Sequence, residues 1–246
     1  MLFGIVIYEG VEPIDLATFG VLSMARRIRP DIEICTIAPR GGVTVLAGGM
    51  RVIADYDLQT VPRVDVLIIT GGPGWPAQAR SPEMLDFLRR RGAEIPVVSV
   101  CTGGLILAAS GLLDHKAATT KRAVVPPELS PLQLLRDAYP NITVREASLV
   151  DEGNIITGGG VSLCIDTMLH LLKKLFGTEV AAETARIIEY QRAWQANLDQ
   201  FPPLLPNFRF TPKSGHDSDI AACPLCANRR HTEGHMAMTL WGVTSR

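Results

Sequence analysis

The sequence predicts an α/β protein with a mostly parallel central sheet that helices cover on both faces. Two runs, Val66–Thr70 and Pro96–Val100, carry no charge and are rich in β-branched residues, which is typical of strands buried on both faces. Strand-like and helix-like segments also alternate along the chain, as the crossover connections of a parallel sheet require. The chain has 246 residues, which is enough for one large domain whose core needs no disulfide or metal.

The first half of the chain alternates between strands and helices and contains one hairpin. A β-rich run opens it, a segment with helical apolar spacing follows, and a Gly-Gly pair splits the hairpin. Ser81 and Pro82 have the form of an N-cap with proline in the first helical turn. The expected elements are strand Leu2–Tyr8, helix Asp15–Ile28, strand Ile32–Ala38, hairpin strands Val43–Ala47 and Met50–Ala54, strand Val66–Thr70, and a helix from Ser81 to about Arg91.

The second half continues the alternation and then loses it. The expected elements are strand Pro96–Val100, helix Thr102–Ala109 closed by Gly111, a helix from Ser130 to Tyr139, strands Val144–Val150 and Asn154–Thr157, and helices Ser162–Phe176 and Glu179–Gln195. Beyond Leu198, prolines and scattered charges replace the periodic pattern. We therefore expect one folded domain over residues 1–197 and a C-terminal extension without regular periodicity over residues 198–246.

The composition excludes several classes of protein. The 24 basic side chains balance 25 acidic ones, so no basic excess exists to coat nucleic acid, and 47% hydrophobic residues are too many for a disordered chain. The uncharged stretch Pro96–Leu113 approaches transmembrane length, but glycines interrupt it, and a buried strand followed by a buried helix explains it better. Met1–Tyr8 lacks the basic region of a signal peptide, and five cysteines are an odd number. We expect a cytoplasmic protein with reduced thiols and no membrane partner.

Cys101 lies where the second buried run meets the helix that follows. A strand that ends at this residue, with small residues Thr102 and Gly103 after it, predicts a nucleophile elbow, a tight strand-to-helix turn that presents one side chain. The helix N-terminus favours thiolate and offers free N–H groups to a developing anion. Cysteine is more often a buried structural residue. Its place at the carboxyl end of a central strand, where open α/β sheets bind ligands, favours a catalytic role.

Two further segments end on the same edge of the predicted sheet. Gly71 and Gly72 begin a glycine-rich turn after Val66–Thr70, where backbone N–H groups can approach a ligand, so beside Cys101 the turn is a plausible oxyanion hole. The turn is neither a Walker loop nor a GxGxxG fingerprint. Asp15 follows the first strand, and its residue type alone is equally consistent with a loop carboxylate and with a helix N-cap.

The chain resembles the ThiJ/PfpI superfamily, which has the flavodoxin-like three-layer fold of class I glutamine amidotransferases. The Cys-Thr-Gly sequence at Cys101, in place of Cys-His-Gly, resembles the isocyanide hydratase branch and the sensor domains of some AraC-type regulators. The resemblance covers about Leu2 to Gln191. The motifs that carry it occur in the order Glu12-Pro13-Ile14-Asp15-Leu16, Ile68–Gly74, Val100-Cys101-Thr102-Gly103, Ala109–Leu113, Ala118-Thr119-Thr120, and Ile156–Gly160 with Ile165-Asp166.

The resemblance implies a cofactor-independent hydro-lyase that forms homodimers and acts on a small molecule. Cys101 would add to the isocyanide carbon to give a thioimidate, and Asp15 would supply a proton and then help water to release an N-substituted formamide. A carboxyl beside a thiolate has its pKa raised by like charge, which suits Asp15 to this role. Gly72 and Thr102 match pocket positions that offer backbone donors, and Gly71 and Gly103 adjoin them.

The chain departs from the superfamily after Ala118-Thr119-Thr120, where His is usual and Lys121 stands instead. A Cys-His dyad is therefore missing at that position, which argues against peptidase or amidase activity. Lys121 either points outward or brings a positive charge to the site. Two alternatives to the hydratase stay open: a cysteine-based redox or small-molecule sensor without a DNA-binding domain, and, less favoured, a glyoxalase or deglycase, whose usual Glu and His positions hold Asp15 and Lys121.

The C-terminal extension contains a possible metal motif that the superfamily does not normally carry. Cys223 and Cys226 are followed by His231 and His235, and this Cys-x2-Cys-x4-His-x3-His spacing is compatible with a compact zinc knuckle. A solvated segment with charged neighbours is the alternative. Zinc in this extension is the one metal that the sequence suggests.

Overall fold

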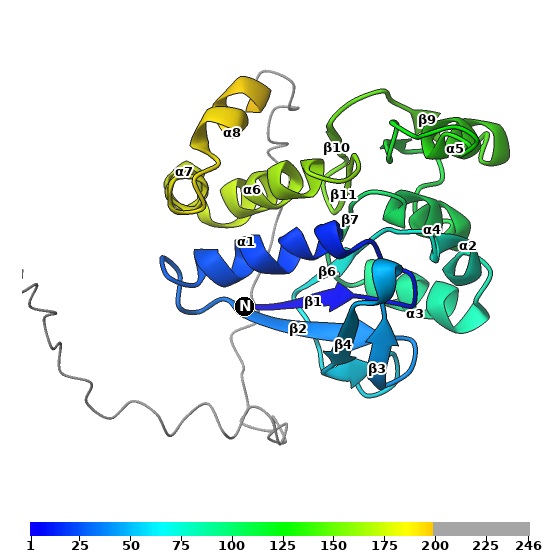
Figure 1. Ribbon diagram of the computed structural model, residues 1–246, viewed down its shortest axis with the longest axis horizontal. Helices are drawn as coiled ribbons and strands as arrows, with labels where there is room; N and C mark the ends of the chain where they lie inside the picture. The colour runs from blue at the N-terminus through cyan, green and yellow to red at the C-terminus, as the bar shows by residue number, and fades with distance from the viewer. Residues whose placement is uncertain (199–246) are drawn as a thin grey trace, which may run out of the picture. The chain divides into compact units, whose positions relative to one another are not determined.

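The computed structural model describes residues 1–198 and has a seven-stranded sheet at its centre (Figure 1). The strand order is β10-β11-β7-β6-β1-β2-β5, and every neighbouring pair is parallel except β10 and β11. The strands are β1 (Leu2–Val6), β2 (Glu33–Ala38), β5 (Tyr56–Asp57), β6 (Val66–Ile69), β7 (Val97–Ser99), β10 (Leu149–Asp151) and β11 (Ile155–Gly158). The predicted α/β fold with a mostly parallel central sheet is therefore confirmed.

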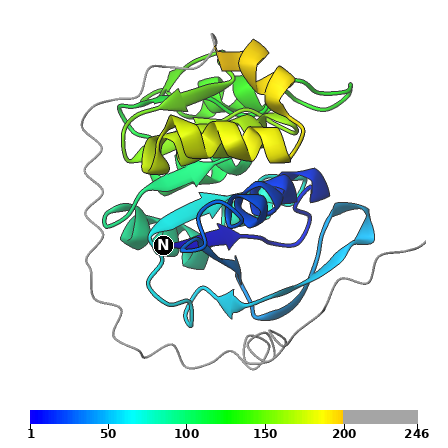
Figure 2. The same ribbon diagram turned by 90° about the vertical axis from the view of Figure 1, so that its left-hand side faces the viewer.

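Helices accompany this sheet in two groups. In one group α1, α6 and α7 contact one another, and α1 and α6 lie side by side in both views (Figures 1 and 2). In the other, α4 contacts α2, α3 and α5. The helices of the two groups are α1 (Ala17–Ala25), α2 (Trp75–Gln78), α3 (Pro82–Gly92), α4 (Gly103–Ser110), α5 (Pro131–Ala138), α6 (Leu163–Phe176) and α7 (Thr178–Ile187). None of the helices within residues 1–198 has the length and apolar character needed to cross a membrane.

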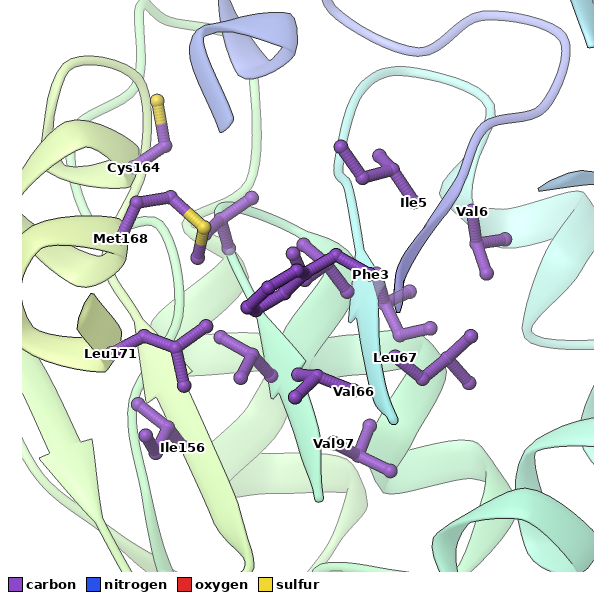
Figure 3. Packing of buried hydrophobic residues seen from close by; sticks show 14 of the residues in the cluster. Phe3, Ile5, Val6, Val66, Leu67, Val97, Ile156, Cys164, Met168 and Leu171 are labelled. Carbon is purple, nitrogen blue, oxygen red and sulfur yellow. The ribbon is translucent and has the colours of Figure 1, made fainter. Parts of the chain in front are cut away.

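The core includes the central strands and helices of both groups, and α6 forms part of it. Phe3 on β1 is fully buried, and Figure 3 shows it among apolar side chains of the neighbouring strands and of α6, including Met168 and Leu171. The runs Val66–Ile69 and Val97–Ser99 are buried along their whole length, as their uncharged sequences predict. Because the two strands are parallel neighbours, their carboxyl ends lie side by side at one edge of the sheet.

A hairpin separate from the main sheet supports the loop after β1. Its strands, β3 (Gly42–Val45) and β4 (Arg51–Ala54), are antiparallel, as predicted. The Val45 carbonyl accepts a hydrogen bond of 2.9 Å from the N–H of Gly10, and the N–H of Ala47 donates at 2.9 Å to the carbonyl of Val11. The hairpin thus fixes the segment that leads from β1 to Asp15.

One predicted strand in the second half is wrong. The expected strand Val144–Val150 divides, because β9 (Thr143–Val144) pairs with β8 (Ala117–Ala118) in a small sheet of its own. Only the end of the expected segment, from Leu149 onward, joins the main sheet as β10. The N–H of Arg145 donates at 2.8 Å to the carbonyl of Ala118 and continues this pairing, so long-range partners override the continuous β-propensity of the segment.

The predicted last helix, Glu179–Gln195, is also divided. It consists of α7 and α8 (Gln191–Asn197), and Glu189 between them has a left-handed φ of 55°. A contact with α6 stabilises the bend, because the Tyr190 hydroxyl donates to Asp166 Oδ2 at 2.9 Å.

Candidate active site

Cys101 occupies a tight turn between a buried strand and a buried helix. β7 ends at Ser99, α4 begins at Gly103, and Cys101 between them has a left-handed φ of 52° and is 2% exposed. Such a φ costs a residue other than glycine about 1 kcal/mol or more, so neighbouring groups must hold it. The N–H of Cys101 donates to the Gly159 carbonyl at 3.0 Å, and the Thr120 hydroxyl donates to the Cys101 carbonyl at 2.7 Å. The structure therefore contains the elbow that the sequence predicts.

Asp15 lies on the short 3-10 helix η1 (Pro13–Leu16) and is fully buried. Its Oδ2 accepts a hydrogen bond of 2.7 Å from the N–H of Gly71, and its Oδ1 is buried with no hydrogen-bond partner among the described residues. Burial raises the pKa of Asp15 to about 7, against the opposing effects of the Gly71 N–H and of the Cys101 side chain. The direction matches the sequence-based expectation, but the main cause is loss of water, whereas the expectation attributed it to like charge.

The pKa of Cys101 moves in the direction opposite to the sequence-based expectation. Burial raises the pKa of the thiol to about 12, and the charge of Asp15 raises it further, while hydrogen bonds from the N–H groups of Val161 and Thr102 and the charge of Lys121 oppose this. The expected low-pKa thiolate is therefore wrong, because the helix N-terminus is outweighed by desolvation and by the neighbouring carboxyl. As the pH rises through about 7, Asp15 loses its proton while Cys101 keeps its own, so above this pH the pair holds one proton.

The glycine turn after β6 reaches the elbow directly. A Cβ on Gly71 would collide with the Thr102 N–H and lie 2.8 Å from Cys101 Cβ, so only glycine lets the two turns touch. The N–H of Gly71 is used by Asp15, and the N–H of Gly72 donates to the Thr102 hydroxyl at 2.8 Å. The turn thus positions the acid and the elbow, and its two N–H groups already have acceptors.

The first residues of α4 complete the predicted set. A Cβ on Gly103 would lie 2.5 Å from the carbonyl of Ile69 and 2.8 Å from that of Thr70, so this glycine allows the helix to begin against the strand. The structure brings together Cys101, Asp15, Gly71, Gly72, Thr102 and Gly103. The N–H groups that act on the sulfur belong to Thr102 and Val161.

Sequence reasoning missed three residues of this neighbourhood. The Tyr8 hydroxyl is fully buried, donates to the Thr70 carbonyl at 3.0 Å, and is hydrogen-bonded to the side chain of Thr102. Val161 has a left-handed φ of 58°. This conformation is rare for a β-branched residue, so the sequence does not predict it. The thiol of Cys164, on α6, contacts the carbonyl of Ile14 at 3.7 Å, beside the catalytic candidate Asp15.

The metal motif and the extension are outside the part of the chain that the structure describes. Cys223, Cys226, His231 and His235 all follow residue 198, so zinc there stays a prediction. Within residues 1–198, no group of three or more His, Cys, Asp or Glu side chains is arranged to hold a metal ion.

A comparison of the sequence with known families shows to which family the chain belongs. The profile of the DJ-1/PfpI family matches residues 4–174, which is more than half of the chain. The chain belongs to the DJ-1/PfpI family. Among solved structures, a ThiJ/PfpI family protein from Pseudomonas syringae has a TM-score of 0.67 and 28% identity, over 82% of this chain and 76% of the other.

The relatives of this chain include an enzyme and transcriptional regulators. The isonitrile hydratase of Pseudomonas putida is 30% identical over 77% of this chain and 78% of that protein. The HTH-type transcriptional regulator CdhR of Pseudomonas aeruginosa is 26% identical over 67% of this chain. The match spans only 47% of that regulator, which is about half of its length.

Proposed function

We propose that this protein is an isonitrile (isocyanide) hydratase, which adds water to an isocyanide to give an N-substituted formamide. One observation carries the proposal: the fully buried Asp15, with a pKa raised to about 7, interacts with the Cys101 thiol. Hydration of an isocyanide needs a nucleophile and a group that transfers one proton to the carbon and a second to the nitrogen, and this pair supplies both. The similarity to the Pseudomonas putida isonitrile hydratase, along most of both chains, supports the same assignment.

The proposed reaction begins with the singly protonated pair. The Cys101 sulfur forms a bond to the isocyanide carbon while its proton passes to the Asp15 carboxylate and from there to the same carbon, which gives a thioimidate. The N–H groups of Thr102 and Val161, which already favour negative charge on the sulfur, stabilise the attacking thiolate. Because the resting thiol has a pKa of about 12, it needs a base at the moment of attack, and Asp15 is placed to be that base.

The second half of the reaction returns the site to its starting state. Water adds to the carbon of the thioimidate, one of its protons passes through Asp15 to the nitrogen, and the carbon–sulfur bond then breaks. The Cys101 sulfur regains a proton, and the formamide leaves. The balance is one isocyanide and one water consumed for each formamide, with no cofactor required.

The same thiol argues against the redox sensor. Oxidation of cysteine proceeds through the thiolate, and sensor cysteines have low pKa values and are accessible to solvent. Cys101 is 2% exposed and has its pKa raised to about 12, which leaves little thiolate at neutral pH. The hydratase can use such a thiol because Asp15 removes its proton during attack.

The test is hydration of cyclohexyl and p-nitrophenyl isocyanide, followed by detection of the formamide. We expect turnover by the wild type and none by Cys101→Ala, because the thioimidate cannot form. Cys35→Ala is the matched control, since Cys35 is also a buried thiol but lies on β2. Equal rates for Cys101→Ala and Cys35→Ala, or no formamide from the wild type, would refute the proposal.

The value of kcat/KM should also depend on pH, because the reaction needs the singly protonated form of the pair. Because the pKa of Asp15 is about 7, the singly protonated pair forms as the pH rises through that value. We therefore expect kcat/KM to increase about tenfold per pH unit well below 7 and to be level above 8. A kcat/KM that falls as the pH rises from 6 to 8 would contradict the assigned roles.

A further inference from the structure

Lys121 follows a residue that contacts the Cys101 backbone, and its stem packs beside another residue that does so. The hydroxyl of the preceding residue, Thr120, donates to the Cys101 carbonyl at 2.7 Å, and the Cys101 N–H donates to the carbonyl of Gly159 at 3.0 Å. The Lys121 side chain packs on the next residue, Gly160, where an added Cβ would lie 2.7 Å from Lys121 Cγ. The stem of the lysine thus runs along the wall of the Cys101 elbow, and any larger residue at 160 would displace it.

The ammonium group of Lys121 is held only loosely. Its Nζ lies 3.5 Å from Glu128 Oε2, and the two side chains are 23% and 61% exposed. Exposed ion pairs of this length contribute little stability, so another carboxylate can replace Glu128 at low cost. The charge reaches the reacting groups, because Lys121 lowers the pKa of both Asp15 and Cys101. Lys121 is therefore a partly buried cation whose charge acts on both reacting groups and whose present ion pair is weak.

We propose that Lys121 binds the carboxylate of the substrate, so that the preferred substrates are isocyanides that carry a carboxylate near the isocyano group. This inference rests on the proposed hydratase function and specifies its substrate class. When the isocyanide carbon is at the Cys101 sulfur, the carboxylate takes the place of Glu128 on the ammonium group. Charge-assisted contacts of this kind are stronger than neutral hydrogen bonds, and an ester in place of the carboxylate would lose the contact.

A competing role for Lys121 is to balance the negative charge of the Asp15 and Cys101 pair. The two roles differ in what they do to matched substrates. A lysine that only balances the pair would affect the hydration of charged and neutral isocyanides alike. A lysine that binds the carboxylate would affect the ratio of the two.

The experiment compares isocyanoacetate with methyl isocyanoacetate, which differ only in the charged group. We expect the wild type to have a kcat/KM about tenfold or more higher for the carboxylate than for the ester, which corresponds to about 1.4 kcal/mol. Lys121→Met should bring this ratio close to one. The matched control is Lys173→Met, which removes a lysine from the last turn of α6, about 15 Å along the helix from its start. That variant should keep the wild-type ratio.

Glu128→Gln provides a second test of the same inference. It removes the competing carboxylate and should increase kcat/KM for isocyanoacetate by a few-fold, and more than for the ester. A wild-type ratio of one or below, or a ratio that Lys121→Met leaves unchanged, would overturn this inference while the hydratase assignment stands.

A binding measurement separates failure of the inference from failure of the proposed function. Hydration of isocyanoacetate gives N-formylglycine, whose affinity can be compared by calorimetry with that of its methyl ester, without turnover. If the wild type hydrates neither isocyanide, the proposed function fails. Tighter binding of N-formylglycine than of the ester, lost in Lys121→Met, would then still support the carboxylate site, and equal or absent binding would refute it.

Discussion

Two buried aspartates, Asp15 and Asp151, lie in the same domain and have opposite pKa shifts. Burial raises the pKa of Asp15 to about 7, since only one N–H, that of Gly71, donates to its carboxyl from the backbone and one oxygen has no partner. Burial acts on Asp151 too, but hydrogen bonds from His170, Lys174 and the N–H of Gly153 together lower its pKa. Desolvation is common to both sites, and the number of donors decides the outcome.

The surroundings of Asp151 form a closed cluster. Lys174 Nζ lies 2.6 and 2.8 Å from the two carboxyl oxygens, His170 Nε2 lies 2.8 Å from Oδ2, and the three side chains are at most 3% exposed. An aspartate with this many partners is held as a carboxylate and stabilises the fold. An aspartate left with an unpartnered oxygen beside a thiol exchanges its proton near neutral pH, which is what acid–base catalysis requires.

The largest expected effect is on catalysis and tests the role of Asp15. Asp15→Asn keeps an acceptor for the Gly71 N–H but cannot take the thiol proton, so kcat for isocyanide hydration should fall about 10²–10⁴-fold. The measurement is steady-state formamide production at pH 8 with a far-ultraviolet circular dichroism spectrum to verify folding. A loss below tenfold in a folded variant would show that Asp15 is not the acid–base group.

The next largest effect is on stability and tests the role of Asp151. Asp151→Asn removes the negative charge from the buried ion pair with Lys174, and removal of one partner of a buried ion pair costs about 3–5 kcal/mol. We expect a loss of about 3 kcal/mol in the free energy of unfolding, measured by urea denaturation. The kcat per folded molecule should stay close to that of the wild type. A stable Asp151→Asn variant with low kcat would reverse the roles that we assign to the two aspartates.

A third prediction uses the pH dependence of stability in Asp15→Asn. The pKa of Asp15 rises from its ordinary 3.8 to about 7 on folding, so the native state holds this proton more tightly than the unfolded state. The stability that it contributes is present below pH 4 and is lost as the pH rises through 7, at about 1.4 kcal/mol per pH unit in between. Asparagine does not titrate, so its stability relative to the wild type should improve by about 3 kcal/mol from pH 5 to pH 8.

Thermal or urea unfolding of both proteins at the two pH values tests this directly. Other groups titrate alike in the two proteins and cancel in the difference. A difference that is independent of pH would mean that Asp15 is not buried as a weak acid, and the proton-sharing mechanism would lose its basis.

Much of the fold and part of the candidate site could be predicted from the sequence, and the reasons for the rest are physical. The uncharged strands and Cys101 followed by Thr102 and Gly103 predicted the sheet and the elbow, because those features are local. The pKa of Cys101 could not be predicted, since it depends on how deeply the long-range contacts of the fold bury it. The left-handed Val161 and the Asp151 cluster likewise depend on contacts between distant segments, for which no local pattern exists.

The smallest expected effect concerns Tyr8, whose hydroxyl joins the end of β6 to the Cys101 elbow. Its hydroxyl donates to the Thr70 carbonyl at 3.0 Å and is hydrogen-bonded to the side chain of Thr102, whose hydroxyl accepts from the N–H of Gly72 at 2.8 Å. Tyr8→Phe removes these bonds and should lower the free energy of unfolding by about 1 kcal/mol. It should lower kcat a few-fold by loosening Thr102, with the pH midpoint of kcat/KM unchanged. Tyr139→Phe, at the end of α5, is the matched control and should alter neither kcat nor the midpoint. A shift of that midpoint in Tyr8→Phe would instead make Tyr8 a third member of the proton-sharing group.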